Sequence, residues 1–286
     1  MPDINKILVA NRGEIALRVI RTCKELGKKT VAVYSTPDAD APHVLQADES
    51  VHIGPASSSE SYLVMDKIIK AAKDTGADAI HPGYGFLSEN GDFSERCREE
   101  DIIFIGPKAK AIRLMGDKTA ARDIMGKANV PFPPGTKKEL EDVEEAEKIA
   151  DEIGYPVLVK AAAGGGGKGM RIVNDKDEFR SGIKAAKSEA RNAFGDDRVY
   201  IEKYLVEPRH VEFQIIADEH GNTLHVFDRE CSIQRRHQKV IEEAPCSILT
   251  PELRSEMAEA AIAAAEAVDY VGAGTIEFLV DADRNF

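Results

Sequence analysis

A run of four glycines between two strand-like segments constrains the fold of this chain most. Residues 163–170 read Ala-Gly-Gly-Gly-Gly-Lys-Gly-Met, and the apolar segments 156–161 and 170–173 flank them. Glycine has no side chain to hold the backbone away, so such a loop can place several N–H groups on phosphate oxygens. A plain hairpin tip is the alternative, but four consecutive glycines lose much conformational entropy for a simple turn. The pattern favours a glycine flap that closes over phosphate.

The context of this loop excludes two common nucleotide motifs. Its glycines match the spacing G-x-G-x-x-G, but that motif follows a strand and opens a helix, whereas residues 170–173 are strand-like. A Walker A loop ends in Gly-Lys-Ser or Gly-Lys-Thr, and this loop does not. The sequence therefore predicts a flap between two antiparallel strands.

The first hundred residues alternate strand-like and helix-like segments with short loops between them. Strands are expected at residues 6–10, 30–34, 77–81 and 102–105, and helices at residues 14–26 and 62–75. Such alternation predicts a doubly wound α/β domain built on a parallel sheet. Ligands of these sheets bind beyond the carboxyl ends of the strands, which draws attention to residues 11–14 and 81–85.

The chain changes character after a proline-rich joint at residues 130–135. Before it, residues 108–128 are expected to form one or two helices. Helices are expected after it at the acidic residues 139–152, at residues 175–192 with Asp175 as the N-cap, and at residues 251–268. Strands are expected at residues 199–205, 210–218, 223–229, 239–243 and 275–281. We expect antiparallel pairing here, and so an α+β fold distinct from the first half.

Charge and cysteine content exclude several classes of protein. The chain has 38 basic and 50 acidic residues, a net charge of −12, which argues against binding to nucleic acid or to an anionic membrane surface. The sequence shows neither a secretion signal nor an apolar run long enough for a membrane span. Its four cysteines are scattered, which fits a reduced cytoplasmic protein better than a disulfide or zinc framework.

Three charged residues become candidate site residues if the flap binds phosphate. Lys160 interrupts the apolar residues 157–161, where a lysine either extends to solvent at a sheet edge or binds a negative charge. Glu277 alternates with apolar residues in a predicted strand. Alone it would be a surface residue, but near phosphate it is a candidate magnesium ligand. Lys118 begins a predicted helix and by itself would be an ordinary surface lysine.

A row of polar residues precedes a local basic cluster. His210, Glu212 and Gln214 share one face of a predicted strand, which could be an ordinary solvated face. Residues 230–239 (ECSIQRRHQK) then concentrate cations and amides in an otherwise acidic chain. Such a cluster indicates an anion site. With the flap, the lysines and Glu277, it predicts a magnesium-dependent enzyme that acts on nucleotide phosphates.

The whole chain resembles the biotin carboxylase component of biotin-dependent carboxylases of the acetyl-, propionyl- or pyruvate type, a family of ATP-grasp enzymes. The matching segments are residues 7–16 (ILVANRGEIA), 81–90 (HPGYGFLSEN), 115–118 (MGDK), the glycine flap, and 229–239 (RECSIQRRHQK). The resemblance implies that bicarbonate attacks the γ-phosphate of ATP to give carboxyphosphate, which then carboxylates the ureido nitrogen of biotin. ATP and Mg²⁺ or Mn²⁺ would be required, and bicarbonate and carrier-bound biotin would be substrates. The implied partners are a biotin carboxyl carrier protein, a carboxyltransferase subunit and a second copy in a homodimer.

The resemblance also implies roles for individual residues. Lys118, Lys160 and His210 would bind the phosphates or ribose of ATP. Glu202, Lys203, Leu205 and Met170 would lie at the adenine, and Gln234 and His237 would line the nucleotide site. Gly164, Gly165, Gly166, Gly167 and Gly169 would form the lid. Glu277 would hold magnesium, and Lys239 would lie at the bicarbonate–biotin centre.

The 286 residues would divide into four parts. Residues 1–115 would form the N-terminal biotin carboxylase domain, 116–134 a helical linker, 135–205 the ATP-grasp lid lobe, and 206–286 the first part of the catalytic lobe. The family continues into a motif with a second metal carboxylate, an asparagine and bicarbonate-binding arginines. The sequence stops before that motif, so we expect an N-terminal fragment that binds ATP weakly and carboxylates little or not at all.

Two other classes remain open at this point. Another ATP-grasp ligase, of the carbamoyl-phosphate or purine-pathway type, would share the flap and the two lysines but should lack the segment 230–239, and free biotin should not stimulate its ATP turnover. A binding or scaffold module would keep the fold without the chemistry. The joint presence of Lys118, Lys160, Lys239 and Glu277 speaks against a scaffold.

Overall fold

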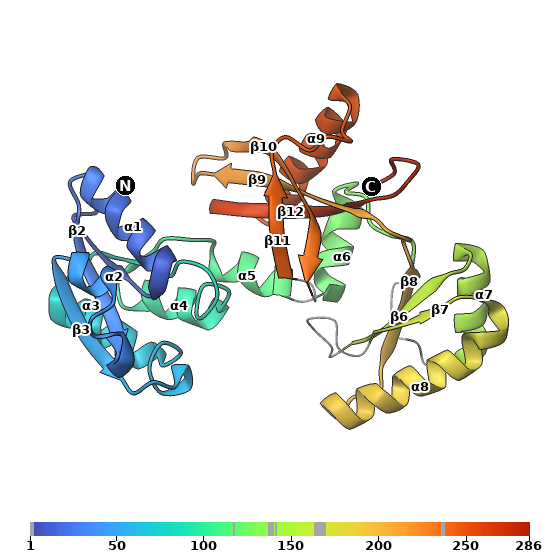
Figure 1. The fold of residues 1–286 in the computed structure, drawn as a ribbon, viewed down its shortest axis with the longest axis horizontal. Coiled ribbons are helices and arrows are strands. Elements are labelled where there is room, and N and C mark those ends of the chain that lie inside the picture. Colours follow the sequence, from blue (N-terminus) through green and yellow to red (C-terminus); the bar gives the residue numbers. More distant parts are fainter. Residues whose placement is uncertain (1–2, 117, 137–139, 141, 163–169, 236–237) are drawn as a thin grey trace. The chain divides into compact units, whose positions relative to one another are not determined.

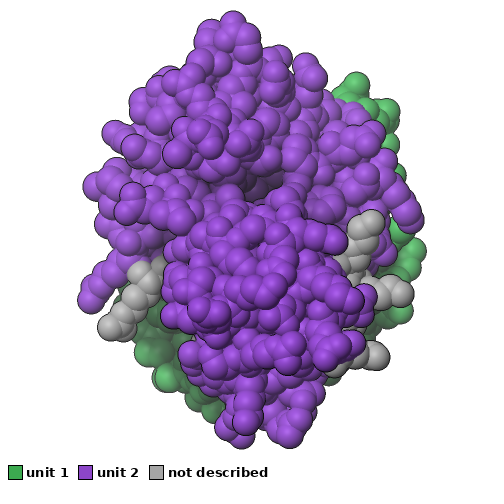
Figure 2. Space-filling model, turned by 90° about the vertical axis from the view of Figure 1, so that its right-hand side faces the viewer, with its two compact units in different colours: residues 1–118, 217–222, 268–273 green, residues 119–216, 223–267, 274–286 purple. Residues whose placement is uncertain are grey.

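The computed structural model describes residues 3–116, 118–136, 140, 142–162, 170–235 and 238–286. The chain forms two compact units, which are coloured separately in Figure 2. Unit 1 comprises residues 1–118, 217–222 and 268–273, and unit 2 comprises residues 119–216, 223–267 and 274–286. All four cysteines are buried and free. Among the described residues, no helix combines the length and the apolar character needed to cross a bilayer.

Unit 1 contains a five-stranded sheet with the order β3-β2-β1-β4-β5, of which β2 and β3 are labelled in Figure 1. Every neighbouring pair of strands is parallel, which confirms the predicted parallel sheet. The central strand β1 is almost wholly apolar because both of its faces are buried. The strands are β1 (Lys6–Val9), β2 (Lys29–Ser35), β3 (Glu49–Gly54), β4 (Ala79–His81) and β5 (Ile103–Phe104).

Two apolar clusters lie on opposite faces of this sheet. Ile7 and Val9 of β1 pack with helix α1, whereas the alternate residue Leu8 packs with residues of α3 and α4. The sheet is therefore doubly wound, as predicted. Strand β3 and helix α4 were not predicted, because half of the residues of β3 and most of those of α4 are polar. The helices of unit 1 are α1 (Gly13–Glu25), α2 (Pro42–Gln46), α3 (Met65–Thr75), α4 (Gly91–Glu99) and α5 (Ala109–Gly116), with short 3-10 turns at Thr36–Asp38 and Ser58–Glu60.

Helix α6 (Lys118–Lys127) belongs to unit 2 except for its first residue, and unit 2 also contains a small antiparallel sheet with the order β7-β6-β8. Its strands are β6 (Val157–Ala161), β7 (Met170–Val173) and β8 (Val199–Lys203), and both pairings are antiparallel. The predicted hairpin around the flap is thus confirmed, although the flap residues 163–169 lie outside the described residues. Helices α7 (Val143–Ile153) and α8 (Lys176–Phe194) share an apolar core with this sheet.

Capping residues determine where helices α7 and α8 begin. Asp175 accepts a hydrogen bond from the N–H of Glu178 at 3.0 Å and starts α8 as predicted. Helix α7 begins at Val143 rather than at residue 139, because Asp142 caps it by accepting from the N–H of Glu144 at 2.8 Å. Leu140 lies before the cap and donates its N–H to the carbonyl of Val199 at 2.9 Å.

A four-stranded sheet with the order β11-β10-β9-β12 follows (Figure 1). Its strands are β9 (Arg209–Ala217), β10 (Thr223–Arg235), β11 (Gln238–Glu243) and β12 (Gly272–Val280), and helix α9 (Pro251–Ala267) packs against β10. Strand β10 was predicted to end at residue 229, but it continues to Arg235 and pairs antiparallel with β11. Most of the basic segment 230–239 therefore belongs to a β-hairpin.

Candidate functional site

The face of the three-stranded sheet opposite α7 and α8 carries several predicted site residues. Val157, Val159 and Ile201 are buried in the core with these helices, so the residues that alternate with them face the other way. Lys160 and Met170 are paired directly in register between β6 and β7. Strand β8 adds Glu202 to the same face. Three of the residues predicted at the nucleotide thus share one surface.

The carboxylate of Glu202 binds two cations. Lys160 donates from Nζ to one carboxylate oxygen, and Arg122 of α6 donates from Nη2 to the other. The Glu202 side chain is only 15% exposed, so this pairing is largely shielded from water. Lys160 is therefore held within the unit rather than extended into solvent. Arg122 was not predicted, because the sequence places it 80 residues from its partner.

Residues 135 and 136, at the end of the proline-rich joint, help to place Glu202. Gly135 forms an isolated antiparallel bridge with Glu202, and Arg122 also donates from Nη1 to the carbonyl of Thr136 at 3.1 Å. A Cβ atom on Gly135 would lie 2.5 Å from the carbonyl oxygen of Ile201, which is far too close. Glycine at this position therefore allows the joint to lie against β8.

Other residues predicted at the nucleotide lie elsewhere or outside the described residues. Lys203 donates from Nζ to the carbonyls of Gly154 at 2.9 Å and Tyr155 at 3.1 Å, so backbone oxygens hold its amine. Leu205 is half-buried beyond the end of β8. The Lys118 side chain, Gly164, Gly165, Gly166, Gly167, Gly169 and His237 are outside the described part.

A second cluster lies on the four-stranded sheet. Lys239 of β11 donates from Nζ to the carboxylates of Glu212 on β9 and Glu277 on β12. Strands β11 and β12 are the two edges of this sheet, which would be about 14 Å apart if it were flat. Two register shifts in β10, between Glu230 and Gln234, interrupt the ladder, and such irregularities bend a strand. A bend there shortens the distance that the side chains of Lys239 and Glu277 must span.

Electrostatic interactions keep Glu212 and Lys239 charged. Burial alone would raise the pKa of Glu212, but hydrogen bonds from Lys239 and Arg229 outweigh it and lower that pKa. Burial alone would likewise lower the pKa of Lys239, but its bonds to Glu212 and Glu277 raise it. The amine is therefore a fixed cation and not a base. Lys239 and Glu277, predicted from the resemblance, are in direct contact, whereas Glu212 was predicted only as part of a polar face.

Glu277 has the chemistry of a magnesium ligand. Its side chain is 63% exposed, and one carboxylate oxygen binds Lys239. Magnesium prefers hard oxygen ligands and commonly takes one or two carboxylates together with substrate phosphates. A single accessible carboxylate beside a fixed cation fits such a site.

His210 and Gln234 lie on the neighbouring strands β9 and β10. The backbone N–H of His210 donates to the hydroxyl of Ser232 at 3.1 Å. The amide nitrogen of Gln234 donates to the carbonyl of Cys231 at 2.8 Å. Both side chains are half-buried, so each is partly accessible from the surface of unit 2.

The loops at the carboxyl ends of β1 and β4 in unit 1 bind each other. The Asn11 side-chain amide donates to the carbonyls of Pro82 and Tyr84, both at 2.7 Å, and the Tyr84 hydroxyl bonds to the Glu14 carboxylate. Gly83 has a φ of +66°, and a Cβ there would lie 2.7 Å from Asn11 Nδ2. These two loops therefore hold the carboxyl ends of β1 and β4 together.

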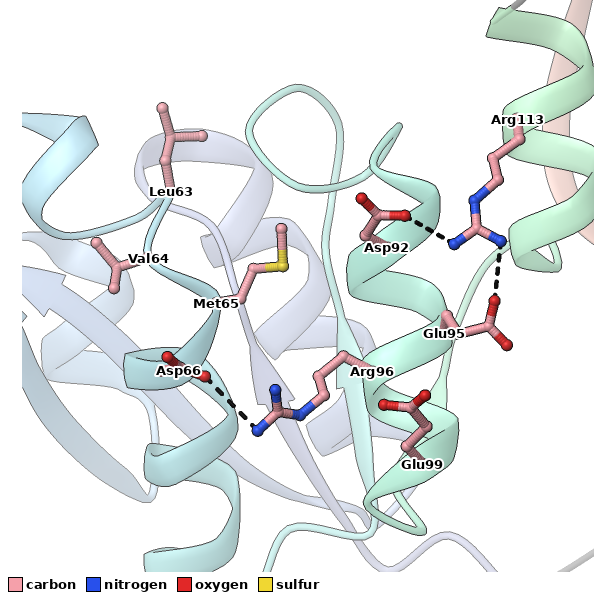
Figure 3. A pocket seen from close by; sticks show the side chains of 9 residues that line it. All are labelled: Leu63, Val64, Met65, Asp66, Asp92, Glu95, Arg96, Glu99 and Arg113. Atoms are coloured by element: carbon pink, nitrogen blue, oxygen red, sulfur yellow. Dashed lines mark hydrogen bonds and ion pairs between the residues drawn. The ribbon is translucent and has the colours of Figure 1, made fainter.

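Unit 1 also has an open pocket of about 800 Å³ (Figure 3). Its charged groups pair with one another: Arg113 binds Asp92 at 2.7 Å and Glu95 at 2.8 Å, and Arg96 lies 3.6 Å from Asp66. None of the predicted site residues lines it. The lining residues are Leu63, Val64, Met65, Asp66, Asp92, Glu95, Arg96, Glu99 and Arg113.

Comparison with known proteins gives two family matches and close relatives. Residues 3–112 match the biotin carboxylase N-terminal domain, and residues 117–286 match the carbamoyl-phosphate synthase L chain ATP binding domain. The chain is 59% identical over 283 residues to the mitochondrial methylcrotonoyl-CoA carboxylase subunit alpha of Dictyostelium discoideum, covering 99% of this chain and 40% of the relative. It is 56% identical over 278 residues to biotin carboxylase 1 of Bacillus subtilis, covering 97% of this chain and 62% of the relative.

A solved structure agrees with this assignment. The biotin carboxylase domain dimer of Hydrogenobacter thermophilus 2-oxoglutarate carboxylase, in complex with MgADP, ADP and bicarbonate, matches with a TM-score of 0.88 and 48% identity. The match covers 100% of this chain and 63% of that chain, so the chain spans less than two thirds of each of these proteins. The two family matches together span nearly all its residues. The chain therefore belongs to the biotin carboxylase family, with the N-terminal domain of that family followed by its ATP-binding domain.

Proposed function

We propose that this chain is the ATP- and bicarbonate-using part of a biotin-dependent carboxylase, which carboxylates biotin on a carrier protein. The observation that carries the proposal is the position of Lys239, a fixed cation bound to both Glu212 and the accessible carboxylate of Glu277. A cation beside a magnesium-type ligand suits chemistry in which phosphoryl charge must be neutralised. The Hydrogenobacter relative, bound to MgADP and bicarbonate, supports this proposal.

The two clusters would have different roles in the reaction. The sheet face with Lys160, Met170 and Glu202 would hold the nucleotide, and the cluster around Lys239 would hold the reacting groups. In full, the nucleotide would contact Lys118, Lys160, Gly164, Gly165, Gly166, Gly167, Gly169, Met170, Glu202, Lys203, Leu205, His210, Gln234 and His237. These assignments rest on the family pattern and on the shared faces described above.

In the proposed reaction, a bicarbonate oxygen forms a bond to the γ-phosphorus of ATP, and the bond to ADP breaks. The resulting carboxyphosphate would transfer its carboxyl group to the ureido nitrogen of biotin and release phosphate, which would take up the proton that this nitrogen loses. Lys239 is protonated, so it would orient bicarbonate and offset negative charge but would not remove a proton. Magnesium held by Glu277 would supply charge neutralisation at the phosphates. The glycine flap would exclude water from carboxyphosphate.

The proposal also covers partners and organisation. We expect a biotin carboxyl carrier protein, a carboxyltransferase subunit and, as in the Hydrogenobacter relative, a homodimer. Residues 135–205 would act as the lid lobe, and residues 206–286 would carry the reacting groups. A cytoplasmic location stays a prediction, since one relative is mitochondrial.

Calorimetric titration of the chain with ATP, with and without Mg²⁺, tests the proposal. We expect binding that strengthens with Mg²⁺, whereas a scaffold module would show no magnesium-dependent heat. Any ATP hydrolysis should rise with bicarbonate and free biotin. Magnesium-dependent ATP binding with hydrolysis that biotin leaves unchanged would instead favour another ATP-grasp ligase. The segment 229–239 and the match to the biotin carboxylase N-terminal domain favour the first outcome.

A further inference from the structure

We propose that Arg229 is a positioning residue for the amine of Lys239 and acts on it through Glu212. This inference rests on the proposed function, because it concerns the same cluster. Arg229 lies on β10, between the strand that carries Glu212 and the strand that carries Lys239. It lies in the matching segment 229–239, but the resemblance assigned it no individual role.

The guanidinium of Arg229 binds two side chains of β9 at once. It donates from Nε to Oε1 of Glu212 at 2.7 Å and from Nη1 to Oε1 of Gln214 at 3.1 Å. Glu212 is buried and can rotate only if a bond is broken. With its Oε1 atom held by Arg229, its Oε2 atom is directed at Lys239. The position of the amine is thereby fixed from the opposite side of the carboxylate.

Arg229 also supplies the positive charge that this group of side chains requires. Glu212, Cys231 and Glu242 place their ligand-type atoms within 4.8 Å of one another, a grouping that could hold a metal ion. The guanidinium lies beside the two carboxylates, bound to Glu212 and with Nε 3.8 Å from a carboxylate oxygen of Glu242. Three successive ion pairs link Arg229, Glu212, Lys239 and Glu277, so that positive and negative side chains alternate. Each member is held by the one before it.

The same guanidinium orients the amide of Gln214 toward β12. Because Arg229 donates to the Gln214 oxygen, the amide nitrogen faces the other way and donates to the carbonyl of Gly274 at 2.8 Å. Gly274 lies on β12, the strand that carries Glu277. Arg229 therefore helps to place both partners of Lys239. A planar fork is needed for this, because a lysine at the same position keeps the charge but not two donors in fixed directions.

A double-mutant cycle tests the inference on the 286-residue chain. The affinity for MgATP is measured by calorimetry for the wild type, Arg229→Lys, Lys239→Met and the double variant, alongside thermal unfolding. Arg254→Lys is the matched control. Arg254 has a similar exposure of 24% against 27% for Arg229, and it donates to the buried Asp228 at 2.6 Å, but it lies outside both clusters. If Arg229→Lys does not fold, Glu212→Gln takes its place in the cycle, because it alters the carboxylate through which Arg229 is proposed to act.

If Arg229 acts through Lys239, Arg229→Lys weakens MgATP binding at least fivefold in the parent chain and less than twofold when Lys239 is already Met. Coupled residues show this kind of non-additivity. The control should lower the melting temperature and leave the affinity of the folded chain within twofold. Equal losses in both Lys239 backgrounds, or an unchanged affinity, would overturn the inference and leave the proposed function standing. A wild-type chain without magnesium-dependent binding would overturn both.

Discussion

Lys239 forms an ion pair with Glu277 although their strands are the two opposite edges of the four-stranded sheet. The register shifts of β10 occur in the segment that carries the basic residues, and such irregularities bend a strand. A fixed cation and a magnesium-type carboxylate thus come from elements that the sequence separates by 38 residues. Their contact underlies the predictions for the site.

The first prediction concerns Glu277. Glu277→Gln removes the negative charge but keeps the shape, so we expect MgATP affinity to fall about tenfold, as when one carboxylate ligand is lost. Binding of ATP in the presence of a chelator should change little. Calorimetry under both conditions checks this, with Glu243→Gln, an exposed residue of β11, as the control. An equal loss with and without Mg²⁺ would show that Glu277 does not act through the metal.

The second prediction concerns Glu202, which neutralises Lys160 and Arg122 together. Glu202→Gln leaves two neighbouring cations without their carboxylate, so we expect the free energy of unfolding to fall by about 1–3 kcal/mol. Urea denaturation measures the change. Glu189→Gln serves as the control, because its pair with Arg171 is exposed and should contribute little. Equal effects of the two variants would contradict the prediction.

The third prediction concerns Gly135. Gly135→Ala would place a methyl group against the carbonyl of Ile201, so the joint must move away from β8. We expect a loss of about 1–3 kcal/mol in the free energy of unfolding and weaker ATP binding, because Glu202 is the bridge partner. Gly126→Ala is a matched control within α6, where the new methyl group would meet Phe132 at an ordinary 3.6 Å. The prediction fails if the first variant is as stable as the second.

The fourth prediction concerns pH and unit 1. His43 is fully buried, and burial lowers its pKa below the usual 6.5 despite the nearby Asp38 carboxylate. The unfolded chain then binds more protons than the folded chain below pH 6.5, so the free energy of unfolding decreases as the pH falls through that value. Asp38 titrates in a separate range, because hydrogen bonds from Tyr62 and Ser35 and the charge of Arg12 outweigh its burial and hold its pKa below 3.8.

His43→Leu should reduce the loss of stability between pH 6.5 and pH 5, as followed by urea denaturation at several pH values. His81 is half-buried, and desolvation lowers its pKa too, so the variant should remove only part of the dependence. His52→Gln, at an exposed position of β3, is the control for the loss of a histidine side chain. A slope that His43→Leu does not alter would contradict the assignment.

Much of the fold could be predicted from the sequence because it depends on local patterns. The buried strand β1, the capped start of α8 and the hairpin around the flap follow from apolar runs, cap residues and glycines. Strand β3 and helix α4 were missed because an edge strand and a largely polar helix carry little apolar periodicity. The start of α7 was misplaced because acidic residues extend the helical pattern beyond the capping Asp142.

The sequence by itself determined the family, the doubly wound first half, the antiparallel second half and the types of residue that could bind phosphate and magnesium. Only the tertiary structure decided which of these residues meet: Lys160 with Glu202 and Arg122, and Lys239 with Glu212 and Glu277. The role of Arg229 could not be predicted from the sequence for the same reason, since its two partners lie on another strand. Contacts across a sheet depend on strand order, register and curvature, and these arise from packing between segments far apart in the chain.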